Sequence, residues 1–256
     1  MTEVRAQGRF AGVVKIVSFN VRFYVLSAAV LAVAAILIAS EKLGILAEFM
    51  VLSFAIVVGF WMLSSVLVSW YVYDHSEVTQ WQWLPNRLPV LPHRWANIHA
   101  GLDESTLALR RLLPGTEGTA VDIYDPVEMT EPSIARARHF HPSGEPFKHG
   151  TYDALPLLEN ECDTVFLLFA AHEVRNEEHR MRLLRQSATV VREQGCVVLV
   201  EHLRDWKNFI AFGPGTFHFY SRRNWLRNIR AAGLVVVQES PVTPFVDCFV
   251  LGKADR

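Results

Sequence analysis

Histidine and carboxylate residues follow two apolar runs in the second half of the chain, and they suit acid–base chemistry. His172 comes shortly after the run at residues 164–169, and Glu201 and His202 come directly after the run at residues 196–200. Such runs are typical of buried strands, whose carboxyl ends form the mouth of an open parallel sheet. A histidine there can accept a proton from a hydroxyl group, although it can also simply cap the strand. We predict His202 as the first candidate base, then His172, with Glu201 beside them.

Other chemistries find less support in the sequence. His218 is a third candidate base, but the ten histidines include no pair at the H-x-x-x-H spacing of a helical metal site, so we predict no metal. The three cysteines are widely spaced, which favours reduced, structural thiols over a disulfide framework or a zinc knuckle. The net charge of −1 offers no basic face, and we predict no nucleic-acid partner.

Charged residues are sparse in the first 73 positions, which carry five Lys or Arg, three acids and no histidine. Residues 23–40 and 49–73 contain no charge, and each run is long enough as a helix to cross a hydrocarbon core of about 30 Å. A secretory signal is the alternative for the first run, but no small-x-small cleavage site follows it and a second apolar run does. We therefore predict a two-helix transmembrane hairpin at residues 23–73.

The flanking charges indicate how this hairpin is oriented. Four cations precede the first helix, and the loop between the helices carries one lysine. The positive-inside bias then places both ends in the cytoplasm. Residues 1–22 form a basic amphipathic segment that either lies on the membrane surface or extends the first helix. We expect an integral protein of a bacterial inner membrane with its N-terminus and catalytic domain in the cytoplasm, in contact with membrane lipids. Small residues in the hairpin would permit homo-oligomers.

A proline-rich connector is predicted at residues 74–94. Its three prolines exclude a long helix and stiffen the link to the rest of the chain. Trp81 and Trp83 could rest at the membrane interface. The connector is either a plain spacer packed on the following domain or a part of the substrate entrance.

Residues 95–256 alternate short apolar runs with helical patterns, which indicates a parallel α/β sheet. Strands are predicted at residues 96–101, 119–123, 147–151, 164–169, 196–200, 234–239 and 244–251, and helices at 103–113, 131–139, 176–193 and 221–232. Gly195 and Gly233 are expected to end the last two helices, and Ser221 to cap the final one. The last two strands have no helix between them. The predicted fold is therefore a Rossmann-like, seven-stranded α/β sheet with a C-terminal β-hairpin.

Several local patterns in this domain occur together. Residues 155–201 contain a Leu-Pro turn, an aspartate opening an apolar strand, His172, a long helix and a strand ending in Glu201. Residues 121–125 read VDIYD, and residues 217–233 run through a helix with one tryptophan to the terminal hairpin. With these motifs, residues 95–253 resemble the class I S-adenosylmethionine-dependent methyltransferases. The family's G-x-G-x-G loop is reduced here to a single central glycine, Gly101.

The resemblance implies a methyltransferase sheet that binds S-adenosylmethionine at the ends of its first four strands. It assigns His99 and Gly101 to the cofactor loop, Asp122 to the ribose hydroxyls, Ile123 to the adenine face, Tyr152 or Asp153 to the adenine amino group, and Phe169 and Ala170 to the methionine end.

The apolar segment at residues 208–219 bears on the substrate. We predict a loop around Gly-Pro-Gly that either covers the core or forms a lid toward a lipophilic acceptor or the bilayer, and the hairpin favours the lid. The whole pattern predicts a membrane-anchored methyltransferase acting on a lipid, isoprenoid, quinone-like ring or polyene, at oxygen. The alternatives are a degenerate methyltransferase fold that serves as a membrane scaffold, and a nicotinamide-dependent reductase. The reductase is disfavoured because both G-x-G-x-x-G and Tyr-x-x-x-Lys are missing.

Overall fold

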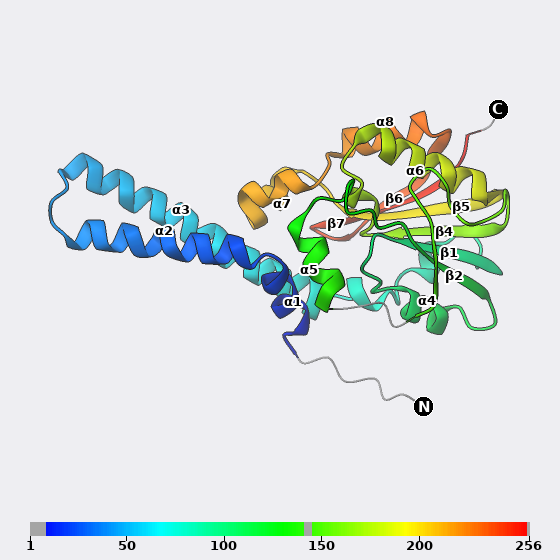
Figure 1. Ribbon diagram of the computed structural model, residues 1–256, viewed down its shortest axis with the longest axis horizontal. Helices are drawn as coiled ribbons and strands as arrows, with labels where there is room; N and C mark the ends of the chain where they lie inside the picture. Colours follow the sequence, from blue (N-terminus) through cyan, green and yellow to red (C-terminus); the bar gives the residue numbers. More distant parts are fainter. Residues whose placement is uncertain (1–8, 141–144, 255–256) are drawn as a thin grey trace. The chain divides into compact units, whose positions relative to one another are not determined.

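The computed structural model describes residues 9–140 and 145–254. The chain divides into two compact units. The hairpin unit contains Met1–Ser76 and Trp206–Thr216, and the sheet unit contains Glu77–Asp205 and Phe217–Arg256. Figure 1 gives the succession of elements along the chain.

The sheet unit is built on seven strands in the order β3-β2-β1-β4-β5-β7-β6. Strands β1 to β5 are parallel, and β7 runs antiparallel to both of its neighbours. The strands are β1 (Arg94–His99), β2 (Glu117–Asp122), β3 (Phe147–His149), β4 (Cys162–Leu168), β5 (Val191–His202), β6 (Leu234–Thr243) and β7 (Val246–Lys253). The predicted Rossmann-like sheet with its C-terminal hairpin is confirmed.

Helices cover both faces of this sheet. Strand order reverses direction at β1 and β4, so right-handed crossovers place α4 (Thr106–Leu112) and α6 (Glu177–Val190) on opposite faces. In Figure 1, α6 lies beside α8 (Arg222–Ala231) above the sheet and α4 lies below it. The remaining helix of this unit, α5 (Pro132–Phe140), follows β2 in the chain. The apolar runs of β4 and β5 are fully buried between the two layers.

Helix ends in the sheet unit follow local capping chemistry. The Asn176 side chain accepts hydrogen bonds from the backbone N–H groups of Glu178 and His179 at the start of α6. The predicted cap Ser221 likewise accepts from the N–H of Asn224 at the start of α8. Gly233, at φ +77°, ends that helix as predicted.

The prediction for Gly195 is wrong. Helix α6 ends at Val190, not at residue 193, and Gly195 lies inside β5, which begins at Val191. A β-carbon at this position would stand 2.5 Å from the carbonyl oxygen of Asp163 in β4. The residue is glycine because two strands approach closely here, and the pairing of β5 with β4 overrides the local helix signal.

The hairpin unit contains two helices that are long and apolar enough to cross a membrane. They are α2 (Val21–Ala39) and α3 (Ile45–Trp70), which pack on each other and expose large apolar side chains elsewhere. A shorter helix, α1 (Ala11–Phe19), precedes them and is separated from α2 by a break at Asn20, so it does not extend the first long helix. The backbone N–H groups of Gly12 and Val13 donate to the Asp74 carboxylate, at 2.6 and 2.8 Å. The first eight positions of the predicted segment 1–22 lie outside the described residues.

The segment predicted as an apolar loop at residues 208–219 is helical. It forms α7 (Trp206–Phe212) and a 3-10 helix, η5 (Gly213–His218). Within the hairpin unit, α7 packs on α3: the rings of Phe209 and Trp61 meet edge-on at 5.4 Å, and the Ser64 hydroxyl donates to the carbonyl of Ile210. The local sequence did not reveal this helix because its apolar side chains find their partners on α3.

The connector at residues 74–94 contains only short helical turns, as its prolines predict. They are the end of a π-helix, η1 (Tyr71–His75), and two 3-10 helices, η2 (Val78–Gln80) and η3 (Pro85–Arg87). Trp81 is 2% exposed and packs inside the sheet unit, so the interpretation of this side chain as a membrane-interface anchor is wrong. Its ring lies 5.9 Å from that of Phe169, at the end of β4.

Candidate active site

The predicted site residues gather where parallel strands end. In β1 and β2, His99 pairs directly with Asp122, so these two strands end level with each other. In β4 and β5, Leu168 pairs with Val200, two residues before His202. Parallel strands present their carboxyl ends at one edge of a sheet, so this edge holds side chains from four strands.

A glycine turn follows β1. Gly101 has a φ of +88°, in the left-handed region where a side chain is strained. A β-carbon there would stand 3.0 Å from Nη1 of Arg138 and 3.1 Å from the ring of Tyr124. The left-handed backbone conformation favours glycine at this point, and a side chain there would also displace the ends of Arg138 and Tyr124 by a few tenths of an ångström.

Asp122 is the last residue of β2, paired with His99 at the end of β1, and is 3% exposed. Its Oδ1 accepts a hydrogen bond from the N–H of Tyr124 at 2.9 Å, and its Oδ2 pairs with Nη1 of Arg138 at 2.5 Å. The guanidinium of Arg138 also lies 4.6 Å from the centre of the Tyr124 ring. Arg138, on α5, was not predicted. The only local signal for it is the pair of arginines in the predicted helix at residues 131–139.

The two ring nitrogens of His99, the last residue of β1, lie next to the glycine turn. Neither of its ring nitrogens has a hydrogen-bond partner within the described part of the chain, and both are buried. Burial lowers the pKa of His99, opposed by the charges of Asp103 and Asp122, so the ring is neutral. Its Nδ1 stands 3.8 Å from Asp122 Oδ1. A buried imidazole without partners is costly unless a polar group completes the site.

The other predicted binding residues have different surroundings. Ile123 and Ala170 are buried directly after β2 and close after β4. Tyr152 stacks on the ring of His179, with 4.2 Å between ring centres, and Asp153 accepts a hydrogen bond from the Thr151 hydroxyl. The side chains of Tyr152 and Asp153 thus already have partners on the surface of the sheet unit.

An aromatic cluster surrounds His202, and we define it as Trp81, Phe169, His202 and Phe219. The His202 ring stacks on Phe219 at 4.9 Å and lies 5.4 Å from Phe169. Phe169 adopts a left-handed φ of +54°, a conformation that a bulky residue rarely takes. The Nδ1–H of His202 donates to the carbonyl of Phe245 at 2.9 Å. Trp81 was not predicted to belong to this site.

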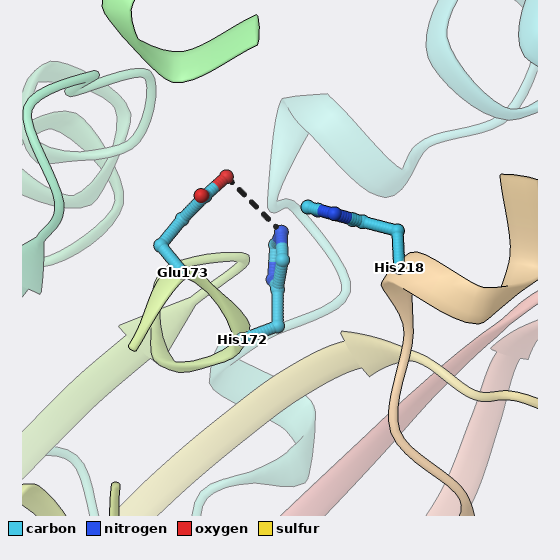
Figure 2. Close-up of side chains that lie close together, drawn as sticks. All are labelled: His172, Glu173 and His218. Carbon is cyan, nitrogen blue, oxygen red and sulfur yellow. Dashed lines mark ion pairs between the residues drawn. The ribbon is translucent and has the colours of Figure 1, made fainter. Parts of the chain in front are cut away.

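A second group, the histidine cluster, contains His172, Glu173, Glu201, His218 and Glu131. His172 lies on the 3-10 helix η4 (Ala171–Glu173), and its Nδ1 is 2.6 Å from Oε2 of the fully buried Glu201. Its Nε2 is 3.4 Å from Oε1 of Glu173. The rings of His172 and His218 are 5.1 Å apart, and Nδ1 of His218 is 3.4 Å from Oε1 of Glu131. Figure 2 shows that the two rings and the Glu173 carboxylate point toward one another.

The electrostatics of this cluster fix the charge of His172. Burial disfavours its imidazolium form, but the attraction of Glu201 and the hydrogen bonds with Glu173 and Glu201 outweigh burial and raise the pKa of His172 to about 10. The hydrogen bond from His218 lowers the pKa of Glu131 against the effect of burial. His172 therefore carries a proton at neutral pH and is a poor proton acceptor, whereas the sequence proposed it as the second candidate base.

The sheet edge thus combines a glycine turn with a buried carboxylate, an aromatic cluster around a histidine, and a charged histidine cluster. The turn suits a polar ligand that needs close backbone approach. The aromatic cluster suits an apolar ligand beside a proton acceptor. The sequence identified His99, Gly101, Asp122, Phe169, His172, Glu201 and His202 for this edge, and it missed Trp81, Glu131, Arg138 and Glu173.

Comparisons with known proteins add the following. Residues 101–199 match the family model described as "Methyltransferase domain", and no curated protein matches the chain. Human N-acetylserotonin methyltransferase, solved in complex with S-adenosylmethionine, is 15% identical, with a TM-score of 0.52 over 76% of this chain and 56% of its own. Mitomycin 7-O-methyltransferase gives 15% identity and a TM-score of 0.51 over 76% and 60%. A protein from Pyrococcus horikoshii is 13% identical, with a TM-score of 0.51 over 69% of this chain and 89% of its own. At these identities the solved structures establish the fold.

Proposed function

From the premise that the sheet unit is a class I S-adenosylmethionine-dependent methyltransferase domain, we propose that this chain methylates an oxygen atom of a lipophilic small molecule at a membrane. The acceptor would be a lipid, an isoprenoid, a quinone-like ring or a polyene. Two of the similar proteins are named for the acceptors N-acetylserotonin and mitomycin, the latter methylated at oxygen, and both acceptors are small molecules.

The residues at the glycine turn fit S-adenosylmethionine. Gly101 allows close backbone approach, Asp122 offers a buried carboxylate, and the buried ring nitrogens of His99 remain to be satisfied. In our proposal Asp122 binds the ribose hydroxyls, Ile123 faces the adenine, and Phe169 and Ala170 face the methionine end. Tyr152 and Asp153 remain proposals for the adenine amino group. The cofactor supplies an electrophilic methyl group on a sulfonium.

His202 is the favoured proton acceptor. Its Nδ1–H donates to the carbonyl of Phe245, which holds the proton of the neutral tautomer on Nδ1. Stacking on Phe219 fixes the plane of the ring, and Phe169 provides a second apolar surface beside it. His172 is less suited because Glu201 and Glu173 stabilise its protonated form. Glu201 acts in this proposal as a positioning residue for His172.

The packing of α7 on α3 carries the proposal of a membrane-bound acceptor. Only three residues separate His202, the end of β5, from Trp206, the start of α7. Helix α7 belongs to the hairpin unit, where Phe209 contacts Trp61 on the long apolar helix. The chain therefore leads directly from the proposed base to a helix packed on a candidate membrane span. This connection supports an acceptor that reaches the site from the lipid phase.

Topology and boundaries complete the proposal. We place residues 1–22 as the basic N-terminal segment, 23–73 as the membrane hairpin, 74–94 as the connector and 95–256 as the methyltransferase domain. The cations before the first helix favour a cytoplasmic domain on a bacterial inner membrane. Small residues on α2 and α3 leave room for hairpins of two chains to associate.

The test is methyl transfer by the full chain in lipid nanodiscs with methyl-labelled S-adenosylmethionine. Extracted membrane lipids are supplied as one acceptor pool and water-soluble metabolites as another. We expect label in the organic phase, released on cleavage of methyl ethers or esters. His202→Gln should lower kcat by about 10²- to 10⁴-fold with unchanged cofactor binding. His93→Gln is the matched control, because His93 is exposed and comes directly before β1, away from the carboxyl ends of the strands. Label confined to water-soluble acceptors would refute the lipophilic substrate.

A further inference from the structure

Three potential metal-ligand side chains of the sheet unit converge at the histidine cluster. His172 and Glu173 come from the turn after β4, and His218 ends η5, some 45 residues later in the chain. Each offers one nitrogen or oxygen atom, and these three atoms lie within 4.8 Å of one another. Figure 2 shows the three side chains turned toward a common point. Two imidazoles and one carboxylate form a donor set that first-row transition metals use in proteins.

Each histidine also has a carboxylate behind it. Glu201 binds Nδ1 of His172 at 2.6 Å, and Glu131 lies 3.4 Å from Nδ1 of His218. A proton held on Nδ1 by a carboxylate leaves Nε2 as the ligating atom. Metal-binding histidines commonly have this outer carboxylate, which fixes both the tautomer and the ring orientation. The cluster supplies one for each histidine.

Glu173 provides an independent sign that a ligand is missing. Its side chain is only 9% exposed, and its Oε1 faces His172. Its other oxygen, Oε2, is buried and has no hydrogen-bond partner among the residues that the structure describes. A carboxylate oxygen buried without a partner costs more than a neutral group would, because its charge is also desolvated. A cation at the centre of the cluster would satisfy it.

We propose that His172, Glu173 and His218 bind a divalent transition-metal ion such as Zn²⁺, with Glu201 and Glu131 as outer-shell residues. Ligand atoms around a tetrahedral ion are about 3.4 Å apart, the distance already found between Nε2 of His172 and Oε1 of Glu173, so binding shortens any of the three separations by at most about 1.4 Å. Three protein ligands leave a coordination position open. A hydroxyl group bound there loses its proton more readily, which is the role we assign to the ion in methyl transfer. This role rests on the function proposed above; the binding site does not.

Metal binding is measured on the full chain in detergent, purified without a polyhistidine tag and stripped with a chelator. Calorimetric titration with Zn²⁺ and the visible ligand-field spectrum of Co²⁺ should both report one ion per chain. Loss of an outer-shell residue lowers metal affinity by about 10- to 100-fold. His218→Ala and the nearly isosteric Glu173→Gln remove a ligand, so each should lower the affinity for Zn²⁺ by at least that factor. His93→Ala, which removes a histidine outside the cluster, should leave affinity unchanged. An unchanged far-UV circular dichroism spectrum and melting temperature verify that each variant is folded.

The absence of stoichiometric binding overturns the proposal, as does equal affinity in Glu173→Gln and the unmodified protein. In that case the cluster is a structural ion pair centred on a protonated His172. Methyl transfer by the stripped protein and by the protein reloaded with Zn²⁺ is measured in parallel. Methylation without stoichiometric metal binding overturns the metal site and leaves the proposed function standing. Stoichiometric metal binding without methylation by the reloaded protein leaves the metal site standing and overturns the proposed function.

Discussion

The Asp122 side chain is held in one orientation by the protein itself, before any ligand binds. Its two oxygens are held by the N–H of Tyr124 and by the guanidinium of Arg138. A carboxylate oxygen has two lone pairs, so each oxygen can still accept a bond from a ribose hydroxyl. Arg138 also lies against Gly101, where a β-carbon would approach it to 3.0 Å. The carboxylate is thus oriented by the protein itself, which lowers the entropy that a ligand must lose on binding.

We expect Asp122→Asn to weaken S-adenosylmethionine binding by about 10- to 100-fold, because hydrogen bonds to a charged acceptor contribute about 1.5–3 kcal/mol. Isothermal titration calorimetry of the full chain measures the loss. Glu117→Gln, an exposed carboxylate at the opposite end of the same strand, is the matched control and should bind normally. Unchanged affinity in Asp122→Asn, with an unchanged melting temperature, would exclude Asp122 from the cofactor site.

At the scale of elements, α7 is the segment whose structure depends most on distant residues. It has only seven residues, too few for a stable isolated helix. Its stability comes from packing on α3, where the Trp61 ring lies against both Phe209 and Gly213. Gly213 has a φ of +55°, and a β-carbon there would be 2.6 Å from the Trp61 ring. The contact between α3 and α7 therefore needs both the large ring of Trp61 and the missing side chain of Gly213.

Trp61→Ala should release α7 locally without unfolding the sheet unit. An edge-on aromatic pair contributes about 0.5–1.5 kcal/mol beyond its buried area, so local opening should become at least roughly two- to twelve-fold more frequent, with the lost buried area adding to this. Hydrogen exchange of backbone amides at residues 206–216 measures this opening. Phe60→Ala removes an exposed aromatic ring next to Trp61 on α3 and should leave the exchange rates unchanged. Equal exchange in both variants would show that Trp61 does not hold α7.

At the scale of the whole molecule, the cysteines report on the integrity of the sheet. Cys162, Cys196 and Cys248 lie in β4, β5 and β7 and are all free and buried. Burial raises the pKa of Cys162 and of Cys248 to about 12, and that of Cys196 in the same direction. Thiolate is the reactive form, so all three groups are protected both by burial and by their protonation.

The folded chain should therefore resist maleimide labelling at pH 7.5, and all three thiols should react once the protein is denatured. Mass spectrometry counts the labels at increasing denaturant, and the three sites should react together because they share one sheet. Bound S-adenosylmethionine should shift the transition to higher denaturant, since it binds only the folded domain. Early labelling of any one cysteine would show that its strand opens independently of the others.

The sequence alone determined the features that depend on local pattern. Uninterrupted apolar runs predicted β4, β5 and the two long helices of the hairpin unit, because burial on all sides needs no polar alternation. The last two strands without a helix between them predicted the terminal hairpin. Short polar signals predicted caps, as at Ser221 and Gly233. The same runs placed Asp122, Phe169 and His202 at or next to strand ends, where the structure has them.

Only the tertiary structure decided what depends on pairs of distant residues. Gly195 was assigned to a helix end by local pattern, but the carbonyl of Asp163 in the neighbouring strand leaves no room for a side chain there. Residues 206–212 are helical because α3 covers them. The histidine cluster joins Glu131, His172, Glu201 and His218, which no spacing in the sequence connects. Burial beside these partners also sets the charge of His172, since an imidazole takes its pKa from the groups that folding brings to it.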